Sequence, residues 1–550
     1  MDELSLDRTV AVVGSGTMGR GIAQVALTAG HPVLLYDAAP GTAERAARAI
    51  GERLDRLVEK GRMSAEQRAG AGARLVAAGQ LSELAPAGLV VEAIVEDLAV
   101  KQRLFADLEG VVADDCLLAT NTSSLPVTAV AAPLRLPGRF VGLHFFNPAP
   151  VLPLVEVVSG AATDRAAADR AHATARAWGK TPVRCTDSPG FIVNRVARPF
   201  YAEAFRVYEE RGADPATIDA VLRESGGFAM GPFELTDLIG QDVNEAVTTS
   251  VWTAFGFDPR FTPSLAQRQL VQSGRIGRKS GHGWYAYGEG AERPIPHTAA
   301  PAKAPESVVL HGDLGPAVEL VPMLEEAGIE VVRGQDHGAR GPEQADQEQG
   351  GPEQGGPEQG GPEGGQEQGG QEQGGHGSGV PGSPGRLELP GGAVLRLTTG
   401  LPATTAEGPP VVLFDLALDY RTAGRIALAA SDTAPPSAVE EAAGLFQALG
   451  KQVSLIDDIP GMIVARTVAM LVDFANDAVA RGVASPEDVD TAMRLGVNYP
   501  LGPLEWGRRL TAARVVDLLD ALGALHPGGR YAPCVRLRRR AAVERSRRHE

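Results

Sequence analysis

Apolar and polar positions alternate in blocks from the N-terminus to about position 160. Apolar runs of strand length occur at 8–14, 32–37, 88–95, 117–120 and 139–143. Helical or charged segments separate most of them, and residues 42–85 form a helix-rich excursion. This alternation predicts a doubly wound α/β sheet. After Pro189 the strand pattern gives way to helical periodicity as far as about Leu270, which predicts an all-helical second domain.

The helical domain recurs later in the chain. WGKTPVRCTDSPGFIVNR at 178–195 returns as LGKQVSLIDDIPGMIVAR at 449–466, and GPFEL at 231–235 returns as GPLEW at 502–506. In the first pair of motifs Gly190 corresponds to Gly461, and in the second pair Gly231 corresponds to Gly502. The number of residues between the two glycines is the same in both pairs. A constant offset of this kind indicates a duplicated domain.

The segment before the second helical copy resembles a degraded nucleotide-binding fold. Residues 307–332 have a strand–turn–helix–strand pattern, and VVLFDLALDY and RIALAAS would continue a sheet. Its turn, HGDLG, lacks a three-glycine spacing, so we expect no cofactor there. Residues 335–385 are almost entirely Gly, Glu, Gln and Pro and are predicted to be a disordered, solvated insertion rather than a partner-binding segment.

These patterns divide the chain into five parts. We expect a nucleotide-binding domain at 1–187, a helical domain at 188–288, a linker at 289–306, a degenerate Rossmann-like domain at 307–448 and a second helical domain at 449–545.

Composition narrows the range of partners and compartments. The 550 residues carry a net charge of −16, of which the acidic insertion contributes −8 through nine acids and one arginine. An acidic chain argues against a nucleic-acid partner. The three cysteines have no metal-ligand spacing, and no apolar run is long enough for a signal core or a membrane span. We therefore expect no metal, no membrane contact and a cytoplasmic location.

The first strand ends in a candidate nucleotide loop. Gly14, Gly16 and Gly19, with Thr17 and Met18 between them, have the G-x-G-x-x-G spacing between a strand and a helix. Such a loop holds a pyrophosphate on the helix N-terminus. Asp37 ends the second strand, which follows that helix. A carboxylate there accepts the ribose hydroxyls and repels a 2′-phosphate, which favours NAD over NADP. FAD binding and an unliganded glycine turn are the alternatives.

The run HFFNPAPVLPLVEVV contains a candidate catalytic pair. His144 follows a strand at the carboxyl edge of the predicted sheet, where such sheets bind ligands. Glu156 is a lone acid among valines, which is costly unless it is paired. Imidazole can take a hydroxyl proton when an acceptor fixes its other nitrogen. On spacing alone, a strand-edge histidine and an outward-facing glutamate fit equally well.

The motifs together resemble the short-chain 3-hydroxyacyl-CoA dehydrogenase family. HFFNP combines with GSGTMGRGIA, VVEAIVED, TNTSSL, SPGFIVNR, MGPFEL and GRKSGHGWY across residues 8–288. The resemblance implies a Rossmann-like NAD domain and a helical domain that dimerises and closes over an acyl-CoA substrate. It also implies that His144 is the base and Glu156 its partner. By the same resemblance Asn194 helps to hold the substrate oxygen, and Ser123 contacts both the substrate and the nicotinamide.

The same resemblance implies further ligand contacts. Glu96, Lys101 and Lys279 match positions that contact the cofactor, and Asn147 lies close by. The basic stretch 53–64 is placed where the family grips CoA, and Arg53, Arg56 and Lys60 are candidates. A solvated helical hairpin fits that stretch equally well.

The second copy has lost the chemistry. Ala465 occupies the position equivalent to Asn194, and the HFFNP and GRKSG motifs are missing. We expect one active site, and we hypothesise that the second helical domain is an internal partner that replaces a second subunit; a homo-oligomer stays possible.

The expected activity is NAD-dependent oxidation of L-3-hydroxyacyl-CoA in fatty-acid or aromatic-acid breakdown. The alternatives are an NADP-dependent 3-hydroxybutyryl-CoA dehydrogenase, a 6-phosphogluconate-like dehydrogenase with a catalytic lysine, and a binding or scaffold protein with a relic site.

Overall fold

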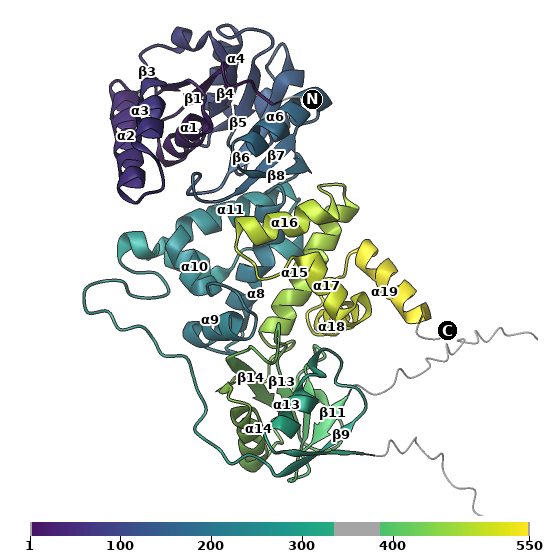
Figure 1. Ribbon diagram of the computed structural model, residues 1–550. Coiled ribbons are helices and arrows are strands. Elements are labelled where there is room, and N and C mark those ends of the chain that lie inside the picture. The colour runs from purple at the N-terminus through teal and green to yellow at the C-terminus, as the bar shows by residue number, and fades with distance from the viewer. Residues whose placement is uncertain (1–2, 335–384, 548–550) are drawn as a thin grey trace, which may run out of the picture.

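The chain folds into two sheet domains with one helical body between them. The computed structural model describes residues 3–334 and 385–547, so 335–384 of the predicted insertion lie outside the described residues. Figure 1 shows the first sheet domain at the top, the helices of both copies in the middle and the second sheet domain at the bottom.

The first domain is a doubly wound sheet in the strand order β3-β2-β1-β4-β5-β6-β7-β8, which confirms the predicted fold class. β6 and β7 are antiparallel, and the other neighbours are parallel. The strands are β1 (Thr9–Val13), β2 (Val33–Tyr36), β3 (Leu75–Ala78), β4 (Ala87–Glu92), β5 (Leu117–Thr120), β6 (Phe140–Phe145), β7 (Leu154–Ser159) and β8 (Thr181–Thr186). The helices are α1 (Thr17–Ala29), α2 (Thr42–Glu59), α3 (Ala65–Ala73), α4 (Leu98–Glu109), α5 (Val127–Ala131) and α6 (Arg165–Ala177).

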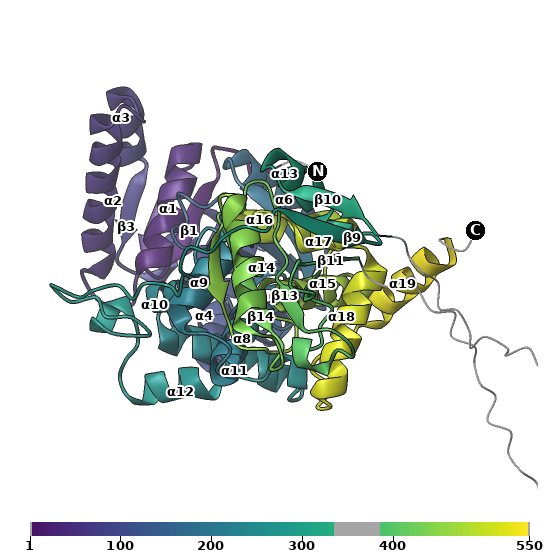
Figure 2. The same ribbon diagram turned by 90° about the horizontal axis from the view of Figure 1, so that it is seen from below.

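β3 lies inside the stretch 42–85, which the sequence pattern predicts to be helical. It is a four-residue edge strand, and three of its four residues are exposed or half-buried. A strand this short, with little apolar burial, leaves no periodic signal in the sequence. The pair α2 and α3 stands out at the outer edge of the domain in both views (Figures 1 and 2).

The helical body contains the two copies. The first consists of α7 (Val193–Val196), α8 (Arg198–Glu209), α9 (Pro215–Glu224), α10 (Pro232–Ile239), α11 (Gln241–Ala254) and α12 (Leu265–Gln272). The second consists of α15 (Val464–Ala480), α16 (Pro486–Gly496), α17 (Pro503–Leu510), α18 (Ala512–Leu525) and α19 (Val535–Arg547). α9 and α16 begin alike, because Asp214 and Ser485 each cap the helix and a proline follows.

The expected linker 289–306 lies against the second domain. The Ala299 amide donates to the Val453 carbonyl of the second sheet, and the Ala302 amide donates to Gln447. Figure 1 shows the segment running down the side of the molecule.

The second sheet is mixed, in the order β10-β9-β11-β12-β13-β14-β15 among the described residues. Its strands are β9 (Ser307–His311), β10 (Glu330–Arg333), β11 (Arg386–Glu388), β12 (Val394–Leu397), β13 (Val411–Phe414), β14 (Arg425–Ala430) and β15 (Gln452–Leu455). Its helices are α13 (Leu320–Glu326) and α14 (Pro436–Ala448). The expected boundary at 448 therefore falls before β15, the last strand of this sheet.

The constant offset between the two copies extends into both sheets. In the first sheet Gly142 faces Val158, and in the second Leu413 faces Ala429, which are the equivalent positions of the repeat. The duplication thus includes the strand triplets β6–β8 and β13–β15. α10 and α11 likewise correspond to α17 and α18, with every boundary shifted by the same number.

The two helical copies pack on each other through α8 and α15. Buried ion pairs join them. Arg195 meets Asp477 at 2.6 Å, and Arg466 meets Glu203 at 2.8 Å. Burial alone would raise the pKa of Glu203, but Arg530 and Arg466 lower it to about 2. Within the described ranges, no helix is both long and apolar enough to cross a membrane.

Candidate active site

His144 and Glu156 face each other across the antiparallel pair β6 and β7. The His144 Nδ1 lies 2.6 Å from the Glu156 Oε2, and both side chains are buried. A carboxylate accepts only when the imidazole carries its proton on Nδ1, so Nε2 is left with a lone pair. The rings of Phe146 and Phe191 flank the imidazole, with centroids at 4.4 and 5.7 Å. An imidazole with its tautomer fixed in this way can accept a proton at Nε2.

The same glutamate connects the sheet to the helical domain. Its Oε1 accepts from the Ile192 amide at 3.0 Å and from the Val193 amide at 2.9 Å. These amides belong to the start of α7, which has no side-chain cap of its own. A helix N-terminus favours a negative charge. Glu156 therefore holds the imidazole and the helix that carries Asn194 in one geometry.

Asn194 and Ser123 meet at the junction of the two domains. The Asn194 Nδ2 donates to the Ser123 carbonyl at 3.4 Å. The Ser123 amide in turn donates to the Glu96 Oε1 at 3.0 Å. Burial would raise the pKa of Glu96, but Lys101 and the Thr122 hydroxyl lower it overall.

Lys101 is buried rather than solvated. Its ammonium lies 2.5 Å from Glu92 and 3.2 Å from Glu96. Glu92 also accepts from the Thr120 hydroxyl at 2.7 Å. Sequence reasoning missed Glu92, although it is a lone acid in an apolar strand, the same signal that singled out Glu156.

The glycine loop has the shape that a pyrophosphate requires. Gly14 has φ +97°, and a Cβ there would lie 2.5 Å from the Ala93 carbonyl oxygen. At Gly19 a Cβ would collide with the Gly14 carbonyl, whereas at Gly16 it would meet no described atom within 4 Å. Thr17 and Met18 begin α1, and the helix has no side-chain cap. Its first amides are thus available to an anion.

Asp37 follows β2 beside this loop. It accepts from the Ser15 amide at 2.9 Å and from the Ser15 hydroxyl at 2.6 Å. Burial opposes ionisation, but these bonds and the Ala39 amide lower the pKa of Asp37. A charged carboxylate therefore stands beside the glycine loop.

Three groups of predicted contacts lie further out. Lys279 pairs with Asp242 at 2.7 Å in the helical domain. Asn147 is exposed, next to a cis bond to Pro148. The basic candidates Arg53, Arg56 and Lys60 lie on or just after α2, with the last two exposed.

Comparison with known proteins decides the family. The 3-hydroxyacyl-CoA dehydrogenase NAD-binding domain matches residues 9–188, and its C-terminal domain matches 190–287 and again 461–550. The reduced Rossmann-fold domain of 3-hydroxybutyryl-CoA dehydrogenase matches 395–460. A 3-hydroxyadipyl-CoA dehydrogenase of Escherichia coli is 43% identical over 98% of both chains. The chain belongs to the 3-hydroxyacyl-CoA dehydrogenase family.

Other relatives of this dehydrogenase differ in how much of it they cover. A solved structure of a 3-hydroxybutyryl-CoA dehydrogenase from Escherichia coli covers 99% of the chain, with a TM-score of 0.83 and 41% identity. A 3-hydroxybutyryl-CoA dehydrogenase of Mycobacterium tuberculosis is 40% identical over 98% of its own length but only 50% of this chain. Short relatives thus match the first half alone. The enzyme is an oxidoreductase acting on CH–OH, with NAD as its cofactor.

The second half of this dehydrogenase carries an aspartate where the first half carries its histidine. By the offset of the repeat, Asp415 takes the position of His144, and Ala427 takes the position of Glu156. Asp415 accepts from the amides of Ile463, Val464 and Ala465 at 2.7–3.0 Å. Asp415 thus caps the start of α15 as Glu156 caps the start of α7, but it does so from the position that is equivalent to His144.

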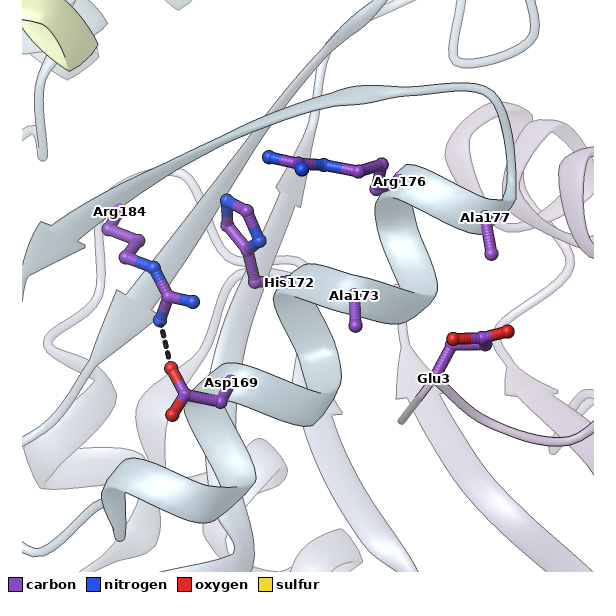
Figure 3. Close-up of a pocket in the computed structure, with 7 residues that line it drawn as sticks. All are labelled: Glu3, Asp169, His172, Ala173, Arg176, Ala177 and Arg184. Carbon is purple, nitrogen blue, oxygen red and sulfur yellow. Dashed lines mark ion pairs between the residues drawn. The ribbon is translucent and has the colours of Figure 1, made fainter. Parts of the chain in front are cut away.

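A surface pocket of the dehydrogenase lies on α6 and β8 (Figure 3). None of the candidate site residues lines it. Asp169 pairs with Arg184 at 2.7 Å there. Burial, followed by Arg184 and Arg176, lowers the pKa of His172.

Proposed function

We propose that this enzyme oxidises the 3-hydroxyl of an L-3-hydroxyacyl-CoA to the 3-oxo thioester. His144 takes the hydroxyl proton at Nε2, and Glu156 stabilises the imidazolium that results. The glycine loop and Asp37 would hold NAD, which would supply the acceptor for the C3 hydride. The observation that carries the proposal is the buried 2.6 Å contact between Nδ1 and the carboxylate. A buried dyad of this kind is suited to proton abstraction near neutral pH.

Asn194 and Ser123 are proposed to hold the substrate oxygen. Their contact at 3.4 Å supports this, because it brings an amide of the helical domain to a loop of the sheet domain beside the dyad. Glu96 and Lys101 are proposed to stabilise the loop that carries Ser123. Asn147 and Lys279 are proposed to contact the cofactor.

Asp37 is proposed to select NAD over NADP. A charged carboxylate accepts ribose hydroxyls and repels a 2′-phosphate. The alternative is an NADP-dependent 3-hydroxybutyryl-CoA dehydrogenase, and the turnover of acetoacetyl-CoA with NADH and with NADPH separates the two.

We also propose the breakdown of fatty or aromatic acids as the setting and the cytoplasm as the compartment. The name of the Escherichia coli relative that matches the whole chain, 3-hydroxyadipyl-CoA dehydrogenase, supports the first. The three free, buried cysteines are compatible with the second.

NADH production from a panel of 3-hydroxyacyl-CoA thioesters tests the function. We expect turnover with NAD that falls about 100-fold or more in His144→Ala, because general-base catalysis is worth about that much. A variant with nearly full activity would favour a lysine-based mechanism. No NAD binding in calorimetry would favour a scaffold with a relic site.

A further inference from the structure

Arg198 is a buried cation that forms no ion pair with any carboxylate of the described residues. It opens α8, and its side chain is 5% exposed. Its guanidinium donates to the Thr248 hydroxyl at 2.9 Å and lies over the Tyr201 ring at 5.0 Å. Among the described residues, its Nε has no hydrogen-bond partner and no carboxylate forms an ion pair with it. Removing a guanidinium from water without pairing it is strongly unfavourable.

The other buried arginines of the described chain do have carboxylate partners. Each lies within 4 Å of an aspartate or glutamate: Arg139, Arg195, Arg425, Arg466 and Arg530. Arg198 therefore differs from the arginines that stabilise the fold. A bound anionic ligand would supply the partner that the described residues do not provide.

The internal repeat relates position 198 to a pocket of the second half. Its equivalent in the second half is Ala469, which lines a small, mainly apolar pocket together with Ala465. Ala465 corresponds to Asn194, the candidate substrate contact. The other lining residues Leu510, Val515 and Leu518 correspond to Ile239, Asn244 and Val247. In the first half the equivalent positions carry Asn194 and Arg198, so we infer that the acyl chain lies along this face, with Arg198 in place of a methyl group.

The distance from Asn194 suits a short acyl chain. Residues 194 and 198 are one helical turn apart, or about 6 Å along the axis. A few carbons beyond C3 span that length. We infer that an acyl chain whose hydroxyl lies at the dyad extends toward position 198.

The second helical copy adds a further donor to this cluster. Tyr499, from the loop between α16 and α17, is buried, interacts electrostatically with Arg198, and has no hydrogen-bond partner for its hydroxyl among the described atoms. Its ring packs against Phe200 and Phe228. Within the described part of the chain, the cluster thus holds two unused donors, Arg198 Nε and the Tyr499 hydroxyl, and no carboxylate accepts from them.

We propose that Arg198 and Tyr499 bind a carboxylate at the far end of the acyl chain, and that Thr248, whose hydroxyl donates to the Asn244 carbonyl, orients the guanidinium. The preferred substrates are then 3-hydroxyacyl-CoA half-thioesters of short dicarboxylic acids. This inference rests on the proposed dehydrogenase function and makes Arg198 its specificity-determining residue. An arginine fork matches a carboxylate with two hydrogen bonds, which a methyl end cannot replace.

The test compares two thioesters of equal carbon number. 3-Hydroxyadipyl-CoA ends in a carboxylate, and 3-hydroxyhexanoyl-CoA ends in a methyl group. We expect the wild-type enzyme to favour the first in kcat/KM by about 100-fold. Arg198→Met should abolish this preference by raising KM for the adipyl thioester, while the hexanoyl thioester keeps its turnover within a few-fold. Arg198→Lys should restore part of the preference.

Two further variants make the result decisive. Tyr499→Phe removes only a hydroxyl and should weaken the adipyl preference several-fold even if Arg198→Met does not fold. Arg223→Met, at a partly exposed arginine on α9 that pairs with Glu234, should leave the preference unchanged. A wild-type enzyme that treats both thioesters equally would overturn the inference, as would equal losses for both in a folded Arg198→Met. Turnover of neither thioester by the wild-type enzyme would instead overturn the proposed function.

Discussion

Glu156 binds two partners that belong to different parts of the fold. One oxygen meets the imidazole of His144, and the other caps α7 through the amides of Ile192 and Val193. The chemistry and the domain junction therefore share one side chain. We therefore expect a change in the helical domain that moves α7 to displace Glu156 and with it the imidazole of His144.

Glu156→Gln separates these two functions. The amide oxygen can still cap α7, but an NH2 group would face Nδ1 and favour the wrong tautomer. We expect kcat to fall about 10²- to 10⁴-fold with little change in Tm, measured by NADH formation and thermal unfolding. A Tm that falls steeply while kcat is preserved would contradict this interpretation of the pair.

Residue patterns revealed part of this site and concealed the rest. A lone acid among valines identifies Glu156 because an unpaired charge in a buried strand is costly, and Glu92 carries the same signal. Arg198 carries none, because an arginine at a helix start is ordinary in sequence. Only the fold shows that it is buried and that no described carboxylate pairs with it.

At the scale of elements, the two strand triplets share one scaffold, but only the first carries the candidate catalytic pair. β6–β8 and β13–β15 share their registers, and each presents a carboxylate to the start of the following helix. Asp415 makes that contact from the position of His144. The constant offset predicted the helical duplication and included β8 and β15, whereas β6 and β7 share no recognisable motif with β13 and β14, because β-strand packing tolerates many apolar residues.

Asp415→Ala tests the capping role. It leaves three buried amides at the start of α15 without an acceptor, so we expect a loss of about 1–3 kcal/mol in unfolding free energy. Activity should stay unchanged because the aspartate bonds to amides at the start of α15 and to none of the candidate site residues. Denaturant unfolding and NADH formation measure the two effects, and a large loss of kcat without loss of stability would argue against a purely structural aspartate.

At the scale of the whole molecule, the helical body depends on buried charge. Glu203 is enclosed by Arg466 and Arg530, with contacts at 2.8 and 2.5 Å. Removing one partner of such a network leaves the others buried and unpaired. The interface between the copies is therefore sensitive to acid.

The sign of that sensitivity follows from the pKa of Glu203, which folding lowers from 4.5 to about 2. The stabilisation is complete above pH 4.5 and is lost as the pH falls toward 2, and it amounts to about 3 kcal/mol. Urea unfolding between pH 5 and 3 should show a decline that is shallower in Glu203→Gln. Equal slopes in both proteins would exclude Glu203 as the source. At pH 7 the variant should itself be less stable by about 3–5 kcal/mol.

A fragment ending near residue 290 tests the proposed internal partnership. It would expose the face of α8 that packs on α15, so we expect it to self-associate or to lose activity. Sedimentation and NADH formation measure the two results. A fragment that is monomeric and fully active would show that the second copy is dispensable.

Arg195 and Arg466 occupy the same repeat position, yet they meet different partners, Asp477 for one and Glu203 with Glu210 for the other. In a homodimer a substitution at such a position would appear on both sides of the axis at once. Here the two sides share one chain, so each can change alone. The association of the two helical copies also does not depend on protein concentration, because both belong to one chain. It holds at any dilution, and Tyr499 can serve a neighbouring site without being copied into a second one.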